Sequence, residues 1–224
     1  MLSTLHRNYQ RLKKLLLIIL FGREKAVLVR FALREYASLR RFNPTNLLEI
    51  YAKHPSDIYQ HLTTLYMLTV EFNLKTILEL GTRDGESTVA LLYAAHQIDG
   101  EVYSVDIDPC LEARNVIESH GFNDRWFFTQ EDDLNFEWTT PIDHLFIDTS
   151  HEFEHTIKEF KKYEPYVKVG GIITLHDTTS CPEVMKAVEE YLRNRSDLRL
   201  YRYLNSNGLA VIFKTSTKNG NQDE

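Results

Sequence analysis

The sequence predicts an α/β fold: an open, mostly parallel sheet of seven strands with helices on both faces and an antiparallel C-terminal hairpin. Three observations carry this prediction. Five short apolar runs alternate with amphipathic stretches of helical length, glycine, proline and aspartate punctuate the junctions between them, and two further strand patterns close the sequence around a turn.

The apolar runs give the first five strands. We expect them at Thr76–Leu80, Val102–Val105, Trp126–Phe128, His144–Ile147 and Ile172–Leu175. Helix patterns lie near residues 86–97, 109–120, 151–163 and 182–194. Strands that alternate with helices of this length indicate a parallel sheet built from right-handed crossovers.

Several helix ends have expected signals. Asp57 is expected to cap a helix in which apolar side chains recur from Ile58 to Phe72. Pro109 is expected at a first helical position, and Gly121 closes that helix. Capping boxes are expected over residues 149–152 and 180–183.

The last two strands form the predicted hairpin. Leu198–Leu204 and Leu209–Phe213 flank the turn sequence Asn205-Ser206-Asn207-Gly208. We therefore expect one domain over residues 46–214, preceded by a helical extension over residues 1–45 and followed by a disordered tail over residues 215–224.

Composition limits the function classes. The chain of 224 residues has a formal net charge of −6, which argues against a nucleic-acid binder as a whole. Its two cysteines, Cys110 and Cys181, form neither a disulfide framework nor a zinc spacing. We expect a reducing, cytoplasmic setting.

The extension over residues 1–45 is basic, with ten Lys or Arg against two Glu, so it carries +8 and the remainder carries −14. Its apolar run Leu15–Phe21 is far shorter than the about 20 residues that cross a bilayer, and no small-residue cleavage site follows it. Two hypotheses remain open. The extension contacts an anionic lipid surface or another acidic partner, or it packs on the domain or on a second subunit.

A candidate ligand site follows the first strand. Gly81 and Gly85 lie in a turn between that strand and a helix whose free N–H groups suit a carboxylate or phosphate. The spacing is not the GxGxxG of dinucleotide sites. Asp106 ends the next strand, where an acid accepts hydrogen bonds from both ribose hydroxyls. Together they indicate an adenosine-containing ligand.

These residues resemble the class I S-adenosylmethionine (SAM)-dependent methyltransferases, which have a Rossmann-like sheet. Glu79–Gly85 is similar to their first motif and Asp106 to the acid of their second. The strand Leu145–Asp148 with the following Thr149–Phe153, and the turn and strand Gly170–Asp177, resemble the catechol O-methyltransferase-like enzymes and the neighbouring macrocin O-methyltransferase and cephalosporin-hydroxylase-like group. The resemblance covers roughly residues 57–213.

The resemblance implies roles for individual residues. The residues expected around the methionine half of SAM and its glycine turn are Glu79, Gly81, Thr82, Gly85 and Ser87. Asp106 would bind the ribose and Asp132 the adenine amine. In metal-dependent members, acids at the positions of Asp148 and Asp177 bind magnesium with an asparagine, which is Thr178 here. His151 matches the base that receives the substrate proton.

Residue chemistry supports the same cluster independently. Asp148 and Asp177 each end a strand, so their carboxylates are expected to converge, and a divalent cation such as Mg²⁺ is one way to hold them together. The ordinary pKa of histidine, about 6.5, suits His151 as a proton acceptor near neutrality. His155, one turn later, is either a further ligand or a surface residue. His176 is either an orienting group or a core residue.

The function expected from these features is SAM-dependent O-methylation of a small hydroxylated molecule, with Asp148 and His151 as catalytic residues. Two alternatives remain. The first is a methyltransferase for nucleic acid or another acidic polymer, recruited by the basic extension. The second is a non-catalytic or hydroxylase-like protein on the same fold.

Overall fold

The computed structural model describes residues 46–216. The chain divides into two units, residues 1–45 and residues 46–224, and every described residue lies in the second. The predictions of a lipid-binding or subunit-binding extension therefore fall outside the described residues. Among the helices between residues 46 and 216, none combines the length and the apolar character that a bilayer crossing requires.

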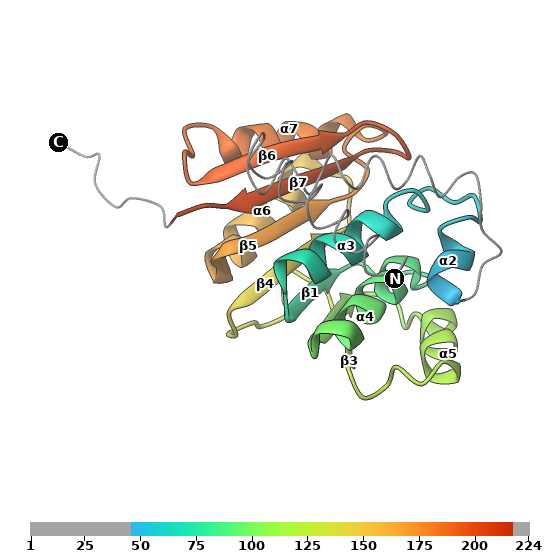
Figure 1. Cartoon of the computed structure of the whole chain (residues 1–224). Helices are drawn as coiled ribbons and strands as arrows, with labels where there is room; N and C mark the ends of the chain where they lie inside the picture. The colour runs from blue at the N-terminus through green and yellow to red at the C-terminus, as the bar shows by residue number, and fades with distance from the viewer. Residues whose placement is uncertain (1–45, 217–224) are drawn as a thin grey trace, which may run out of the picture. The chain divides into compact units, whose positions relative to one another are not determined.

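A single seven-stranded sheet forms the centre of the described unit (Figure 1). Its spatial order is β3-β2-β1-β4-β5-β7-β6. The strands are β1 (Thr76–Leu80), β2 (Glu101–Asp106), β3 (Trp126–Gln130), β4 (Ile142–Ile147), β5 (Val167–Leu175), β6 (Leu198–Tyr203) and β7 (Leu209–Lys214). The first five pair in parallel, whereas β7 pairs antiparallel with both β5 and β6. The predicted fold class is confirmed.

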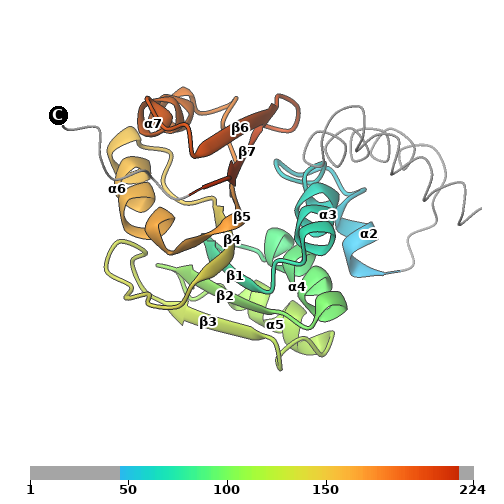
Figure 2. The same cartoon turned by 60° about the vertical axis from the view of Figure 1, so that its left-hand side comes forward.

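Helices cover both faces of the sheet (Figure 2). One face carries α3 (Leu62–Phe72), α4 (Glu86–Ile98) and α5 (Leu111–Ser119), with the short α2 (Leu47–Tyr51) beside α4. The other face carries α6 (Phe153–Tyr163) and α7 (Pro182–Leu192), and the 3₁₀ turn η1 (Glu164–Tyr166) leads into β5. Because the sheet is buried on both faces, its central strands read as continuous apolar runs rather than alternating ones.

The core lies on the sheet faces beneath the helices. Its largest fully buried side chains include Phe146 of β4 and Phe160 and Tyr163 of α6. Phe160 stacks on Tyr191 of α7 with ring centroids 4.6 Å apart, which fixes the two helices side by side. This buried packing fixes α6 and α7 against each other, and each helix follows a strand whose end lies at the site.

Several helix starts differ from the sequence predictions. Helix α3 begins at Leu62 rather than near Asp57, because the Asp57 carboxylate pairs with Arg83 instead of capping the helix. Neither expected capping box forms, since α6 and α7 begin after Glu152 and Cys181 without a side-chain cap. Thr215, expected to start a disordered tail, donates its main-chain N–H to Asp197.

The carboxyl ends of four neighbouring strands form one row. The hydrogen-bond ladder continues past the strands: Gly81 donates to Val105, Asp148 donates to Leu80, and His176 donates to Ile147. Asp106, Gly81, Asp148 and His176 therefore stand side by side along the edge where an open α/β sheet binds its ligands.

Candidate active site

Glu79 lies beneath the row, inside the protein. Its carboxylate accepts hydrogen bonds of 2.7, 2.7 and 2.6 Å from the hydroxyls of Ser87, Thr88 and Ser104. Burial raises the pKa of Glu79 to about 7, although the three hydroxyl donors act in the opposite direction. Glu79 thus ties β1 to α4 and β2. Its contacts are within the protein, and Ser87, which it holds, lines the cavity above.

The two glycines of the turn are required by protein packing. A Cβ atom on Gly81 would lie 2.1 Å from the main-chain oxygen of Asp148, and one on Gly85 would lie 2.7 Å from Cβ of Ala113. Both residues have positive φ values, +89° for Gly81 and +85° for Gly85, which favour glycine. Gly81 lets the end of β1 approach Asp148 after β4, and Gly85 lets the start of α4 approach α5.

Asp106 holds the turn from the adjacent strand. Its Oδ2 accepts main-chain N–H groups from Thr82 (2.7 Å) and Arg83 (3.0 Å), and its Oδ1 accepts that of Asp108. Burial opposes ionisation, but these main-chain donors outweigh it and lower the pKa of Asp106. Asp106 is therefore a fixed carboxylate at the end of β2, as the sequence led us to expect.

Two cavities open at the row of strand ends and share a wall formed by Gly81, Arg83, Asp148 and Thr149. The larger has a volume of about 380 Å³ and contains Asp106 and Asp132. The smaller, of about 190 Å³, is lined by the remaining predicted residues, namely Thr82, Gly85, Ser87, His151 and Asp177. The structure thus brings every predicted residue to these cavities except Glu79 and Thr178.

Both cavities are strongly acidic. The smaller is lined by five acids and the larger by four, counting Asp148 in each, while Arg83 is the single Arg or Lys among the described residues that line either. Arg83 is itself neutralised by a two-bond ion pair with Asp57, with both N–O distances 2.9 Å. An acidic lining favours a cationic ligand and disfavours the phosphates of a nucleic acid.

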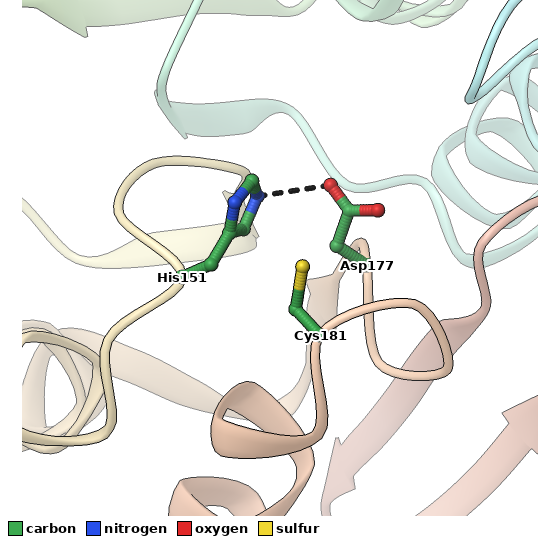
Figure 3. Close-up of side chains that lie close together, drawn as sticks. All are labelled: His151, Asp177 and Cys181. Carbon is green, nitrogen blue, oxygen red and sulfur yellow. Dashed lines mark ion pairs between the residues drawn. The ribbon is translucent and has the colours of Figure 1, made fainter.

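His151 and Asp177 point toward one another across the smaller cavity (Figure 3). His151 precedes α6 and Asp177 follows β5, and Nε2 of His151 lies 2.9 Å from Oδ2 of Asp177. The carboxylates of Asp148 and Asp177 raise the pKa of His151. The sulfur of Cys181, at the start of α7, turns toward the same pair, and one ligand atom from each residue lies within 4.8 Å of the others.

Asp177 is held by several contacts. It has φ +57°, a conformation that aspartate tolerates better than most residues, and its Oδ1 accepts the hydroxyl of Ser180. Burial works against its charge, but the hydrogen bonds from His176 and Ser180 lower the pKa of Asp177. Oδ2 remains for the histidines, so His151 faces a fixed, ionised carboxylate.

His176 lies between the two predicted metal-binding acids. Its Nε2 is 3.1 Å from the main-chain oxygen of Ser206, to which it must donate, and its Nδ1 is 3.4 Å from one oxygen each of Asp148 and Asp177. Although burial opposes the charge, the two carboxylates raise the pKa of His176 to about 10. The cation between the carboxylates is thus the imidazolium of His176.

This arrangement does not fit a magnesium ion held by Asp148, Asp177 and Thr178. Thr178 is 2% exposed, and its hydroxyl packs near Gly208, where a Cβ atom would lie 2.8 Å from it. The group between the carboxylates is an imidazole, whereas magnesium prefers an octahedral shell of oxygen ligands. A magnesium ion at this position is therefore no part of the proposed reaction.

Cys181 and the Asp57–Arg83 pair are parts of the site that the sequence did not predict. Arg83 lies in the segment Glu79–Gly85 and Cys181 in the expected capping box over residues 180–183, but neither was assigned a role in the site. Asp57 was assigned to a helix cap, and the charge of Arg83 does not indicate its partner 26 positions away. The position of Cys181, four residues after Asp177, was the available signal for its proximity to the site.

Comparison with known proteins identifies the domain. Residues 78–178 match a family model described as a methyltransferase domain. The matched segment runs from within β1 to just beyond β5, so it contains the row of strand ends and every predicted site residue from Glu79 to Thr178.

Solved methyltransferase structures share the fold at low identity. An S-adenosylhomocysteine (SAH)-bound methyltransferase of Podospora anserina is 14% identical, with a TM-score of 0.65, covering 88% of this chain and 97% of that one. The O-methyltransferase TomG of Streptomyces achromogenes, in complex with SAM, is 17% identical, with a TM-score of 0.63 and coverages of 81% and 95%. A Bacillus cereus O-methyltransferase in complex with SAH is 18% identical, with a TM-score of 0.58 and coverages of 84% and 90%.

The strand order 3-2-1-4-5-7-6, with its antiparallel β7, defines the class I methyltransferase fold. The family match adds the activity class. The described part of this chain is a class I SAM-dependent methyltransferase domain.

Proposed function

We propose that this protein transfers the methyl group of SAM to a hydroxyl oxygen of a small acceptor. The observation that carries the proposal is the contact between Nε2 of His151 and Oδ2 of Asp177 at the rim of the smaller cavity. A carboxylate that fixes one imidazole nitrogen leaves the other as a base, which is what an alcohol or phenol needs as its oxygen attacks.

The lining of the cavities fits SAM. Its sulfonium is a cation, and the acidic residues on both sides of Gly81 complement it. We assign Asp106 to the ribose and Asp132 to the adenine, because both line the larger cavity. Main-chain atoms of the turn from Gly81 to Gly85, with Thr82 and Ser87, would face the methionine half from the smaller cavity. When bound, SAM supplies an electrophilic methyl group.

The protein residues then position the acceptor and take its proton. The carboxylate of Asp177 accepts a hydrogen bond from Nε2–H of His151. The neutral ring therefore has its lone pair on Nδ1. Nδ1 takes the hydroxyl proton of the acceptor. Asp148, with one oxygen 4.0 Å from Nε2 of His151, stabilises the imidazolium that results. His176 holds the two carboxylates in place.

The alternative of an acidic-polymer methyltransferase has less support. A polyphosphate would have to approach cavities lined mainly by carboxylates, which repel it. A small neutral or cationic acceptor meets no such barrier. The small acceptor is therefore the better match to the site.

Calorimetry with SAH and an acceptor screen test the proposal. We expect SAH to bind the full chain, and we expect SAH release from SAM in the presence of some member of a panel of small sugars, phenols and polyketides. Binding of SAH with turnover on nucleic acid and on none of the panel would favour the polymer alternative. Failure of SAH to bind would favour a non-catalytic protein on this fold.

A further inference from the structure

A second group of metal-type ligands joins the loop after β3 to helix α6. Asp133 lies in that loop, and His155 and Glu159 lie one turn apart on α6. Nε2 of His155 is 3.0 and 3.2 Å from the two carboxylate oxygens of Asp133 and 3.8 Å from Oε1 of Glu159. One ligand atom from each residue lies within 4.8 Å of the other two. Such separations suit ligands of one ion, whose bonds to nitrogen and oxygen are about 2.1 Å long.

Glu159 provides an independent indication that a ligand is needed. Its side chain is fully buried; Oε1 accepts the hydroxyl of Thr149, but Oε2 has no hydrogen-bond partner among the described residues. A buried carboxylate oxygen without a partner is costly. The side chain is therefore suited to a cation that it could share with Asp133.

This group differs from the methyl-transfer site in its share of imidazoles, because two imidazoles face the two carboxylates there. Asp133 and Glu159 face one imidazole, that of His155, in the part of the chain that the structure describes. The ammonium of Lys162 donates to the main-chain oxygens of Asp133 and Leu134 rather than to either carboxylate. A divalent cation bound between them would balance both carboxylates.

We propose that Asp133, His155 and Glu159 bind a divalent first-row transition ion of the zinc type. A ligand set of one imidazole and two carboxylates suits such an ion better than magnesium, which prefers oxygen alone. Asp133 and His155 also line the larger cavity, next to Asp132. The ion would therefore link the loop after β3 to α6 in the wall of the larger cavity.

Cobalt(II) is a suitable probe because its visible absorption reports tetrahedral or five-coordinate binding. The background should be the Asp177→Asn protein, since Asp177 belongs to both other groups of metal-type ligands among the described residues. We expect this protein, after treatment with a chelator, to bind one cobalt ion without a thiolate-to-cobalt charge-transfer band, because Cys181 lies in one of those other groups.

Two further variants make the test specific. Adding His155→Gln or Glu159→Gln to the background should weaken cobalt binding by more than about tenfold. The matched control, His151→Gln in the same background, should bind cobalt unchanged. Zinc should also raise the melting temperature of the background protein but not of the His155→Gln double variant, which separates metal binding from misfolding. An Asp177→Asn protein that binds no cobalt, or a His155→Gln double variant that binds it equally well, would overturn the proposal.

Discussion

Nε2 of His151 lies 2.9 Å from Oδ2 of Asp177, although the two residues belong to different βα loops and are 26 positions apart. The contact fixes which ring nitrogen of His151 carries the proton. His151 lines the smaller cavity at the strand ends, and in the proposed function its other ring nitrogen is the proton acceptor there. The proposed transfer of a methyl group to an oxygen atom depends on this pair.

Replacing His151 tests the base. We expect His151→Gln to lower the methyl-transfer rate roughly 10²- to 10⁴-fold, because the acceptor hydroxyl then loses its proton acceptor. SAH affinity should change little, since the ribose and adenine assignments lie in the other cavity. Single-turnover rates and SAH calorimetry measure the two quantities. His120→Gln, at an exposed position on the far end of α5, is the control.

Replacing Asp177 tests the orientation of that base through pH. Only neutral His151 accepts a proton, so the rate should rise with pH through the pKa of His151. Because Asp148 and Asp177 raise that pKa, the rise should lie above pH 6.5 in the parent protein. Asp177→Asn should move it to lower pH and lower the plateau rate. A pH profile that keeps the parent's midpoint in Asp177→Asn would contradict the pairing.

Asp106 carries the cofactor assignment. Asp106→Ala removes the proposed ribose acceptor and frees the N–H groups of Thr82 and Arg83, so we expect SAH binding to weaken by roughly 2–4 kcal/mol. Calorimetry measures the loss directly. Glu118→Ala, which removes an exposed acid from α5, should bind SAH as the parent does. Equal affinity in Asp106→Ala would remove Asp106 from the site.

Glu79 gives a prediction about stability. Its pKa is raised in the folded protein to about 7, so it favours the folded state fully below pH 4.5, and that contribution is lost as pH rises toward and through about 7. The loss amounts to about 3 kcal/mol. In Glu79→Gln this component is missing, so the difference in unfolding free energy between parent and variant should change with pH across this interval. Urea unfolding at pH values of about 4.5, 6 and 8 measures it; a constant difference would contradict the raised pKa.

Magnesium should have no effect on the methyl-transfer step. Because the imidazolium of His176 lies between Asp148 and Asp177, adding magnesium to chelator-treated enzyme should leave the turnover rate unchanged. The assay needs an acceptor from the screen and saturating SAM. A rate that rises with magnesium and saturates would show that the carboxylates hold that ion after all.

The sheet could be predicted from the sequence because each buried strand is a local apolar run. Phe146 and its neighbours in β4 are an example, and the turn at Gly208 marks the hairpin equally locally. Helix starts were less predictable because polar side chains had competing partners. Asp57 pairs with Arg83, and Thr149 donates to Glu159, so neither was free to cap a helix.

Site residues were predictable where their position alone determines them. Asp106 ends β2, Asp148 and Asp177 follow β4 and β5, and parallel strands end at one edge. Their hydrogen-bond partners depend on side-chain directions that no spacing gives. The buried contacts of Glu79 and the placement of His176 between two carboxylates became evident only from the structure.

Transfer of a labelled methyl group shows which atom of the acceptor is methylated and whether His151 takes part. The full-length protein is incubated with SAM carrying a ¹³C-methyl group and an acceptor from the screen, alongside the His151→Gln variant, and the products are read by carbon NMR. We expect a methoxy carbon signal with the parent protein, formed at least about 100-fold more slowly by the variant. A label found on nitrogen or carbon, or equal rates for the two proteins, would contradict it.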